Sequence, residues 1–200
     1  MSDTIREPKQ KRSIDTKNRI IESGYEMFAK NGYFNTNTAE IAKHAGVSTG
    51  IVYGYFHDKK DILIEVLDIY VAKVFAPFFE MLQSLSAPLD FDDLIPKIID
   101  STVNLHQNNA AIHEALHSLS ASDADVNDRF MQLEEETTRR IVEKVTALGF
   151  PKENCFEKIH IVMEFIQSYA HEYVYDNHSY IDYQVMRNQI IKMLVELLKG

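Results

Sequence analysis

The spacing of apolar residues constrains the fold of this chain more than any other feature of its sequence. Apolar side chains recur mostly three or four residues apart, which is the repeat of an α-helix with one buried side. Only seven glycines and five prolines interrupt this repeat in 200 residues. The sequence therefore predicts an all-α fold in which no strand is needed.

Composition narrows the class of protein. Apolar residues make up 45% of the chain, which is enough for an ordinary packed core. No apolar run approaches the roughly 20 residues that span a bilayer, and the first residues contain no segment like a signal peptide. The single cysteine, Cys155, excludes an intramolecular disulfide and a zinc site built from cysteines. We expect a globular protein of the cytosol with no membrane partner.

Charge is distributed unevenly along the chain. The formal net charge is −9, but residues 1–65 carry a net charge of +1 and residues 66–200 carry −10. Residues 1–19 hold six basic residues against three acidic ones. We expect residues 1–14 to form a flexible basic arm. Taken alone, such an arm suits a solvated terminus as well as a contact with DNA.

Two helices are predicted directly after this arm. The first runs from about residue 16 to residue 30, with Asp15 as its N-cap. The second is short and follows Asn37, whose side chain can form a capping box with Glu40 three residues later.

A third helix is predicted over residues 50–56, after the turn at residues 45–47. Ser48 or Thr49 can cap it, and Val52 and Phe56 point toward the core. Two short helices joined by a tight turn match a helix-turn-helix, whose second helix lies in a DNA major groove about 12 Å wide. A generic helical hairpin is the alternative, but the exposed residues favour DNA.

The surface of this third helix is rich in hydroxyls and glycines and carries no charge. Hydroxyls donate to phosphate oxygens or base edges, and Ile51 suits a thymine methyl. Tyr53 suits a half-buried packing role equally well. Lys59 and Lys60 follow the helix cap Asp58, where free amides and ammonium groups together would bind phosphate. The residues expected at DNA are Ser48, Thr49, Gly50, Ile51, Tyr53, Tyr55, Lys59 and Lys60.

Residues 16–65 resemble the DNA-binding domain of the TetR family of regulators. The resemblance rests on IIESGYEMF at 20–28, GYF at 32–34, TAEIAKHAGVS at 38–48, GIVYGYF at 50–56 and Lys59. It implies a homodimeric repressor that binds a palindromic operator in double-stranded DNA and is released by a small molecule. An activator would use the same helices. The resemblance also implies DNA contacts by Thr38, Ser48, Thr49, Ile51, Tyr53, Tyr55 and Lys59.

Two positions depart from the pattern of that family. Gly24 stands in the first helix where the family usually has alanine, and glycine lowers helix propensity by up to ~1 kcal/mol. Ile51 stands where threonine or serine is common, which puts one hydroxyl contact in doubt.

The remaining residues predict a larger helical bundle. A long fourth helix starts at Lys59, and further helices are expected over 91–108, 110–121, 124–148, 152–176 and 181–199. The last two are apolar over wide arcs, so they bury a second face in the core or against a second subunit. We expect a homodimer through these two helices. The predicted domains are the arm (1–14), a three-helix helix-turn-helix domain (15–60), and a ligand-binding and dimerisation domain (61–200).

A pocket for a small hydrophobic or aromatic effector is expected in this larger domain. Aromatic side chains and methionines with a few polar groups suit such a ligand, although the same residues at helical spacing also form ordinary cores. The candidate lining residues are Phe75, Phe79, His106, His113, His117, Phe130, Met163 and Tyr169.

One motif suggests a different chemistry. His113-Glu-Ala-Leu-His117 matches the helical pattern in which two histidines bind zinc and the glutamate acts as a base. The third histidine of the extended pattern is absent, although Glu134, Glu135 and Glu136 follow downstream. We expect no enzyme, no cofactor and no metal. A zinc hydrolase or a metal sensor centred on residues 113–117 is the alternative.

Overall fold

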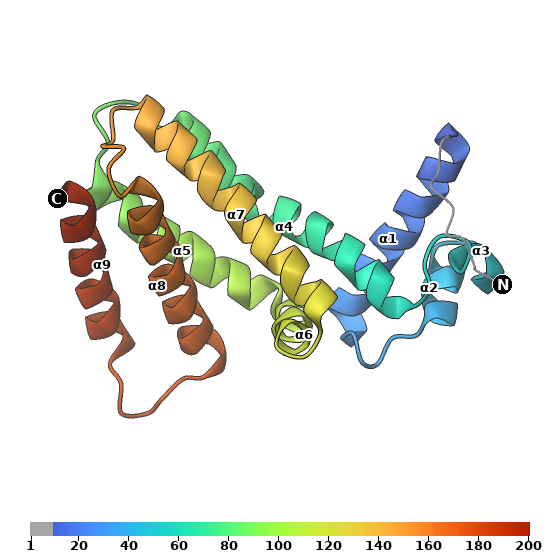
Figure 1. Cartoon of the computed structure of the whole chain (residues 1–200). Coiled ribbons are helices and arrows are strands. Elements are labelled where there is room, and N and C mark those ends of the chain that lie inside the picture. Colours follow the sequence, from blue (N-terminus) through green and yellow to red (C-terminus); the bar gives the residue numbers. More distant parts are fainter. Residues whose placement is uncertain (1–9) are drawn as a thin grey trace. The chain divides into compact units, whose positions relative to one another are not determined.

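The computed structural model describes residues 10–200, except for the side chains of residues 73–75, 77, 111, 114 and 117. All regular elements in this range are helices, which confirms the predicted fold class (Figure 1). None of these helices combines the length and apolar character that a membrane span requires. The helices are α1 (Lys11–Asn31), α2 (Thr38–His44), α3 (Thr49–Val52), α4 (Lys59–Ser84), α5 (Phe91–Asn108), α6 (Ala110–Ser120), α7 (Ala124–Ala147), α8 (Cys155–Tyr175) and α9 (Tyr183–Lys199).

The chain divides into two compact units. Unit 1 comprises Met1–Lys73 and Asn109–Met131, and unit 2 comprises Val74–Asn108 and Gln132–Gly200. Unit 1 is larger than the predicted DNA-binding segment at 15–60, because α1 packs against α6 and against the first part of α4. Helices α4 and α7 each contribute residues to both units.

The start of α1 differs from the prediction. The helix begins at Lys11 with Gln10 as its N-cap, so Asp15 lies inside the helix and caps nothing. Its first turn is held from outside, because the Ser13 Oγ and the Tyr55 hydroxyl oxygen are 2.7 Å apart. Residues 11–14 therefore belong to a helix and not to the predicted arm, while residues 1–9 lie outside the described residues.

The core of unit 1 brings α1, α2, α3 and the start of α4 together. Phe28, Ile41, Val52 and Ile62 are completely buried. A Cβ atom built on Gly24 would lie 2.6 Å from Ile62 Cγ2, closer than carbon atoms approach without displacement. The close packing of α1 on α4 thus accounts for glycine at a position where the family resemblance leads one to expect alanine.

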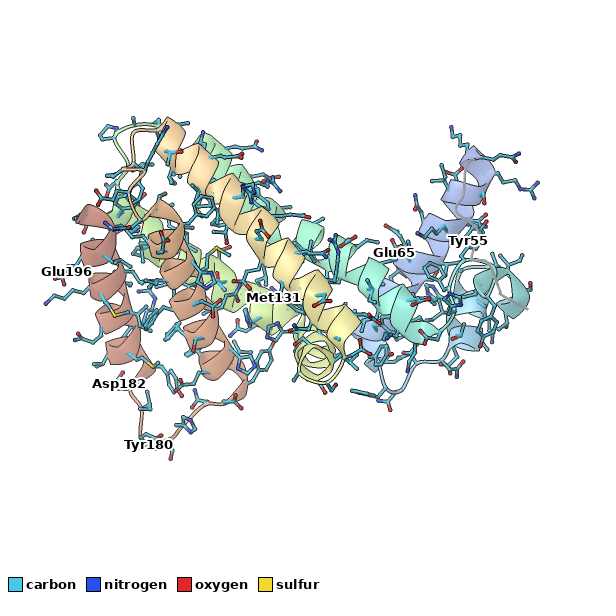
Figure 2. The ribbon with its side chains drawn as sticks, viewed as in Figure 1. Tyr55, Glu65, Met131, Tyr180, Asp182 and Glu196 are labelled. Atoms are coloured by element: carbon cyan, nitrogen blue, oxygen red, sulfur yellow. The ribbon has the colours of Figure 1, made fainter. Side chains whose placement is uncertain are left out.

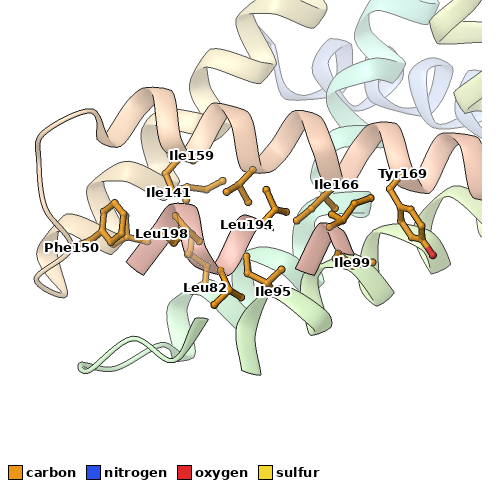
Figure 3. Packing of buried hydrophobic residues seen from close by; sticks show 14 of the residues in the cluster. Leu82, Ile95, Ile99, Ile141, Phe150, Ile159, Ile166, Tyr169, Leu194 and Leu198 are labelled. Atoms are coloured by element: carbon orange, nitrogen blue, oxygen red, sulfur yellow. The ribbon is translucent and has the colours of Figure 1, made fainter. Parts of the chain in front are cut away.

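Unit 2 has a core of its own. Helix α5 packs against α8 and α9, and α8 packs against α9. Buried side chains from these three helices, including Ile95, Ile166 and Leu194, meet Leu82 of α4 and Ile141 of α7 (Figure 3). The five helices predicted beyond residue 90 are confirmed, with α5 at the predicted bounds and the other ends within three residues.

Candidate nucleic-acid interface

Helix α2 is fixed by the capping box that the sequence predicts. The Asn37 Oδ1 accepts a hydrogen bond of 3.0 Å from the Glu40 amide, and a Glu40 carboxylate oxygen accepts one of 3.0 Å from the Asn37 amide. These two bonds satisfy amide groups that a helix N-terminus otherwise leaves unpaired. Ile41 and Ala42 are buried on the opposite side and anchor α2 to the core.

The turn between α2 and α3 depends on a glycine. Gly46 has a φ of +66°, a left-handed conformation that side chains with a Cβ rarely adopt. The Gly46 amide donates to the Lys43 carbonyl at 3.2 Å, and the Val47 amide donates to the Ala42 carbonyl at 3.0 Å. This pattern ends α2 at His44 and lets α3 start at Thr49.

Helix α3 is shorter than predicted. Ser48 is its N-cap, with Oγ accepting from the Ile51 amide at 3.3 Å, and the α-helix ends at Val52 instead of residue 56. The Tyr55 and Phe56 amides still donate to the Val52 carbonyl, at 2.9 and 3.0 Å, and residues 53–55 continue as a turn. Val52 and Phe56 are buried as predicted and hold this segment on the core.

The solvent-facing side of α3 and its flanks carries no charge. Ser48, Gly50, Ile51 and Tyr53 are exposed, with 43% of Ile51 and 55% of Tyr53 accessible. The sequence left a half-buried packing role open for Tyr53, and more than half of its side chain is exposed. The remaining candidates, Thr38, Thr49 and Tyr55, are half-buried. Tyr55, labelled in Figure 2, has its hydroxyl engaged with Ser13 of α1.

Lys59, which the sequence predicts at a phosphate, is engaged inside unit 1. Its ammonium group donates to the carbonyls of Tyr33 at 2.6 Å and Thr36 at 2.8 Å, and it lies 4.1 Å from the centre of the Tyr33 ring. Burial lowers the pKa of Lys59, and nearby Glu40 opposes that effect. Two of its three N–H donors thus fasten the segment between α1 and α2 to the start of α4.

Lys60 is also paired within unit 1. Its Nζ lies 2.7 Å from an Asp125 carboxylate oxygen and 3.1 Å from an Asp123 carboxylate oxygen. Hydrogen bonds to these two carboxylates raise the pKa of Lys60. The predicted pair of phosphate-binding lysines is therefore not a free cationic site, because acidic residues 63 and 65 positions away already neutralise its second member.

Free positive charge lies elsewhere on unit 1. Within the described part of this unit, Lys11, Arg12, Arg19, Lys30 and Lys43 are exposed and form no ion pair. Lys11 and Arg12 adjoin Ser13, whose contact with Tyr55 brings the start of α1 beside the segment after α3. Sequence reasoning noticed these basic residues only as part of a flexible arm. The structure places Lys11 and Arg12 on α1, and the contact of Ser13 with Tyr55 brings this part of α1 beside the segment after α3.

A cavity lies within unit 2. It has a volume of about 80 Å³ and is lined almost entirely by apolar side chains of α4, α5, α7, α8 and α9. Ser101, Thr102 and Gln167 supply the polar groups of its wall. Of the eight residues predicted to line an effector pocket, Met163 lines this cavity.

The other predicted pocket residues are placed differently. The Phe79 ring lies 3.5 Å from the Arg140 guanidinium, His106 is buried with Nδ1 2.9 Å from the Thr102 carbonyl, and Tyr169 belongs to the core of unit 2. His113 and Phe130 belong to unit 1. The side chains of Phe75 and His117 lie outside the described residues. The prediction missed most of the wall because aliphatic residues, including Ile95, Ile98 and Leu105, form it.

The His-Glu-x-x-His motif lies on α6 in unit 1. His113 is buried, and its Nδ1 is 3.4 Å from the Tyr70 hydroxyl oxygen. This contact from α4 holds the imidazole in the interior of the unit. A buried histidine in contact with a tyrosine is the ordinary structural role of such a residue and favours packing over catalysis.

Comparison with known sequences identifies relatives of the N-terminal residues. Residues 20–66 match the family model of bacterial regulatory proteins, tetR family. The transcriptional regulator HbdR of Aromatoleum sp. (strain CIB) is 39% identical over 64 residues, which cover 30% of this chain and 28% of HbdR. The fatty acid metabolism regulator protein of Bacillus subtilis (strain 168) is 46% identical over 48 residues, which cover 24% of this chain and 25% of that protein. The matched segments thus span little more than a quarter of these relatives.

Comparison with solved structures extends over most of the chain. The crystal structure of the transcriptional regulator FadR from Bacillus subtilis in complex with stearoyl-CoA has a TM-score of 0.62 at 20% sequence identity. That alignment covers 89% of this chain and 97% of FadR. A TetR-family regulator from Mesorhizobium loti gives a TM-score of 0.67 at 16% identity, over 95% of this chain and 98% of the other. These likenesses show a common fold for both units.

Proposed function

We propose that this chain, whose residues 20–66 match the family model of bacterial regulatory proteins, tetR family, is a ligand-responsive transcriptional repressor that binds an operator as a homodimer. The observation that carries the proposal is the uncharged, exposed side of α3, presented by a capped turn and a buried Val52 and Phe56. A helix presented in this way fits the major groove. Its neutral surface can contact base edges, and it neither repels the DNA phosphates nor binds them without regard to sequence.

Affinity comes from phosphate contacts beside this surface. Lys11 and Arg12 at the start of α1, and Lys43 on α2, are exposed basic residues without an ion pair in the described part of unit 1. These residues take the place that Lys59 and Lys60 held in the sequence prediction. The hydroxyls of Ser48, Thr49 and Tyr53, together with the Ile51 side chain, then select the sequence of the operator.

The second subunit binds through α8 and α9. Large apolar side chains on these helices remain exposed, and such groups on a helix surface favour association. Two subunits related by a twofold axis would place two α3 helices on a palindrome, with half-sites about 34–36 Å apart. The exposed residues are Phe156, Ile161, Phe165, Tyr173, Val185 and Met193. Sedimentation of the Phe165→Glu variant as a monomer, against a wild-type dimer, would support this surface.

The effector binds in the cavity of unit 2. Its wall is apolar with three polar side chains, which suits a hydrophobic molecule that carries a small polar group. The FadR structure was solved with stearoyl-CoA, and its likeness in fold supports a ligand with an aliphatic chain. The Ser101→Phe variant fills the cavity and should abolish stabilisation by decanoic acid, while Ser84→Phe, at an exposed position outside the wall, should not.

A gel-shift experiment with the DNA upstream of its own coding sequence tests DNA binding. We expect a specific complex that decanoic acid weakens, and Tyr53→Ala should weaken this complex more than a complex with random DNA. Lys11→Ala should weaken both complexes equally and lower the salt slope by about one. Lys30→Ala, an exposed cation at the other end of α1, is the matched control. The absence of any shift at low salt and micromolar protein would contradict the proposal.

A further inference from the structure

Three potential metal ligands converge on the surface of unit 2. They are Glu134 of α7 and His160 and Glu164 of α8, and one ligand atom from each lies within 4.8 Å of the other two. We propose that this triad binds a divalent first-row transition-metal ion, such as Zn²⁺ or Co²⁺. The site is separate from the histidine motif at 113–117, which belongs to unit 1.

The two helices hold the triad in place from both sides. His160 and Glu164 are four residues apart on α8, so they share one face of the helix. Glu134 approaches this face from α7, with Oε1 3.1 Å from the His160 Nδ1. One turn beyond Glu134, the Thr138 hydroxyl lies 3.4 Å from the sulfur of Met163, beside Glu164 in sequence. This contact fixes the register of α7 on α8 at the site.

The chemistry of the triad suits such an ion. Zinc binds imidazole nitrogen and carboxylate oxygen at about 2.0–2.2 Å, so two ligand atoms on a tetrahedral ion are roughly 3.3–3.6 Å apart. The ligand atoms already lie within 4.8 Å of one another, so rotations of the three side chains would bring them to these separations. Three protein ligands at an exposed position leave the remaining coordination to water, which is the arrangement of an exchangeable site.

Charge also favours a cation here. Within the described residues, no lysine or arginine forms an ion pair with Glu134 or Glu164. Glu135, the residue after Glu134 on α7, does have such a partner in Arg139. A divalent ion would neutralise both carboxylates and remove their mutual repulsion.

The position of the site gives it a regulatory consequence. Helices α7 and α8 both line the cavity, through Ile141 and Val145 of α7 and through Met163 and its neighbours on α8. An ion that bridges Glu134 to Glu164 would tie these two walls together and change the affinity of the cavity for a ligand. This last step rests on the proposed effector function, whereas metal binding itself does not.

Titration of untagged, metal-free protein with Co²⁺ and Zn²⁺ tests the site. Calorimetry should give one ion per chain, and Co²⁺ should develop visible absorption bands. A 100-fold excess of Zn²⁺ over its Kd should raise the Tm by roughly 5–10 °C. His160→Ala and Glu164→Gln should each weaken binding at least about tenfold. Both positions are exposed, so the variants should retain the fold, which circular dichroism checks.

Two control variants identify the ligands. His171 lies on the same helix, pairs with Asp176 and is not part of the triad, so His171→Ala should bind the ion as the wild type does. Loss of binding in His113→Ala with retention in His160→Ala would assign the ion to the α6 motif and overturn the proposal. Absence of binding at millimolar metal would also overturn it. These readouts do not involve DNA, so they stand or fail independently of the gel-shift result.

Discussion

The two units of the molecule are specified by contacts of different range. In unit 1 the segment from α2 to α4 is set by hydrogen bonds between residues two or three positions apart, such as Asn37 with Glu40, Ser48 with Ile51 and Asp58 with Asp61. In unit 2 the cavity wall joins residues as far apart as Phe78 and Leu198. Local bonds survive changes elsewhere in a chain, whereas a wall built from distant positions can change residue by residue.

This difference explains the pattern of similarity to other proteins. The sequence match to the family model ends at residue 66, within α4, while the likeness in fold continues through unit 2 at 20% identity or less for the two structures compared above. A DNA-reading turn tolerates little variation, because its caps and its glycine have fixed positions. A bundle needs only apolar residues of suitable size at helical spacing, so its cavity can adapt to a new ligand.

The largest expected effect comes from a substitution that destabilises one unit and leaves the other folded. Phe56 is buried and helps to hold α3 on the core of unit 1. Phe56→Ala should therefore destabilise unit 1 by about 3–5 kcal/mol and abolish the gel shift. Ile99→Ala, at a fully buried position of unit 2, should instead impair ligand binding. Chemical denaturation followed with both activities checks the pair. Equal loss of both activities in both variants would contradict two separable units.

The same distinction governs what the sequence could predict. The capping box at Asn37, the caps at Ser48 and Asp58, and the bounds of α5 followed from residues a few positions apart. The engagement of Lys59 did not, because its acceptors lie 23 and 26 positions away. The cavity wall was missed for a related reason, since an aliphatic residue on a helix looks the same whether it faces a neighbour or a cavity.

A second prediction separates a positioning role from a DNA contact at Lys59. Lys59→Met keeps the length of the side chain but leaves the Tyr33 and Thr36 carbonyls without their donor, so unit 1 should lose about 2–3 kcal/mol of stability. Lys43→Met, at an exposed position of α2, should weaken DNA binding and leave the denaturation midpoint unchanged. If Lys59→Met reduced affinity for DNA without lowering stability, that result would support a direct phosphate contact by Lys59.

A third prediction compares two glycines of unit 1. Gly24→Ala places a methyl group 2.6 Å from Ile62 Cγ2, and the resulting overpacking should exceed the gain in helix propensity, for a net loss of about 1–2 kcal/mol. Gly50→Ala meets only the Ser48 hydroxyl at 4.0 Å, so it should keep the stability and alter DNA affinity alone. Thermal melts and gel shifts on both variants measure this. A stabilised Gly24→Ala variant would show that α1 and α4 are packed less tightly than described.

The smallest expected effect concerns the contact of Lys60 with Asp123 and Asp125. This ion pair joins the two chain segments of unit 1, but its groups are accessible to water and salt, so Asp125→Asn should shift the Tm by about 2 °C or less. Asp123→Ala should cost more, because Asp123 also accepts hydrogen bonds from the Asp125 and Val126 amides at the start of α7. High salt should reduce the wild type to the level of Asp125→Asn and leave the deficit of Asp123→Ala, since a helix cap does not depend on ionic strength as an exposed ion pair does. Equal salt sensitivity of both variants would mean that the ion pair, and not the cap, makes Asp123 important.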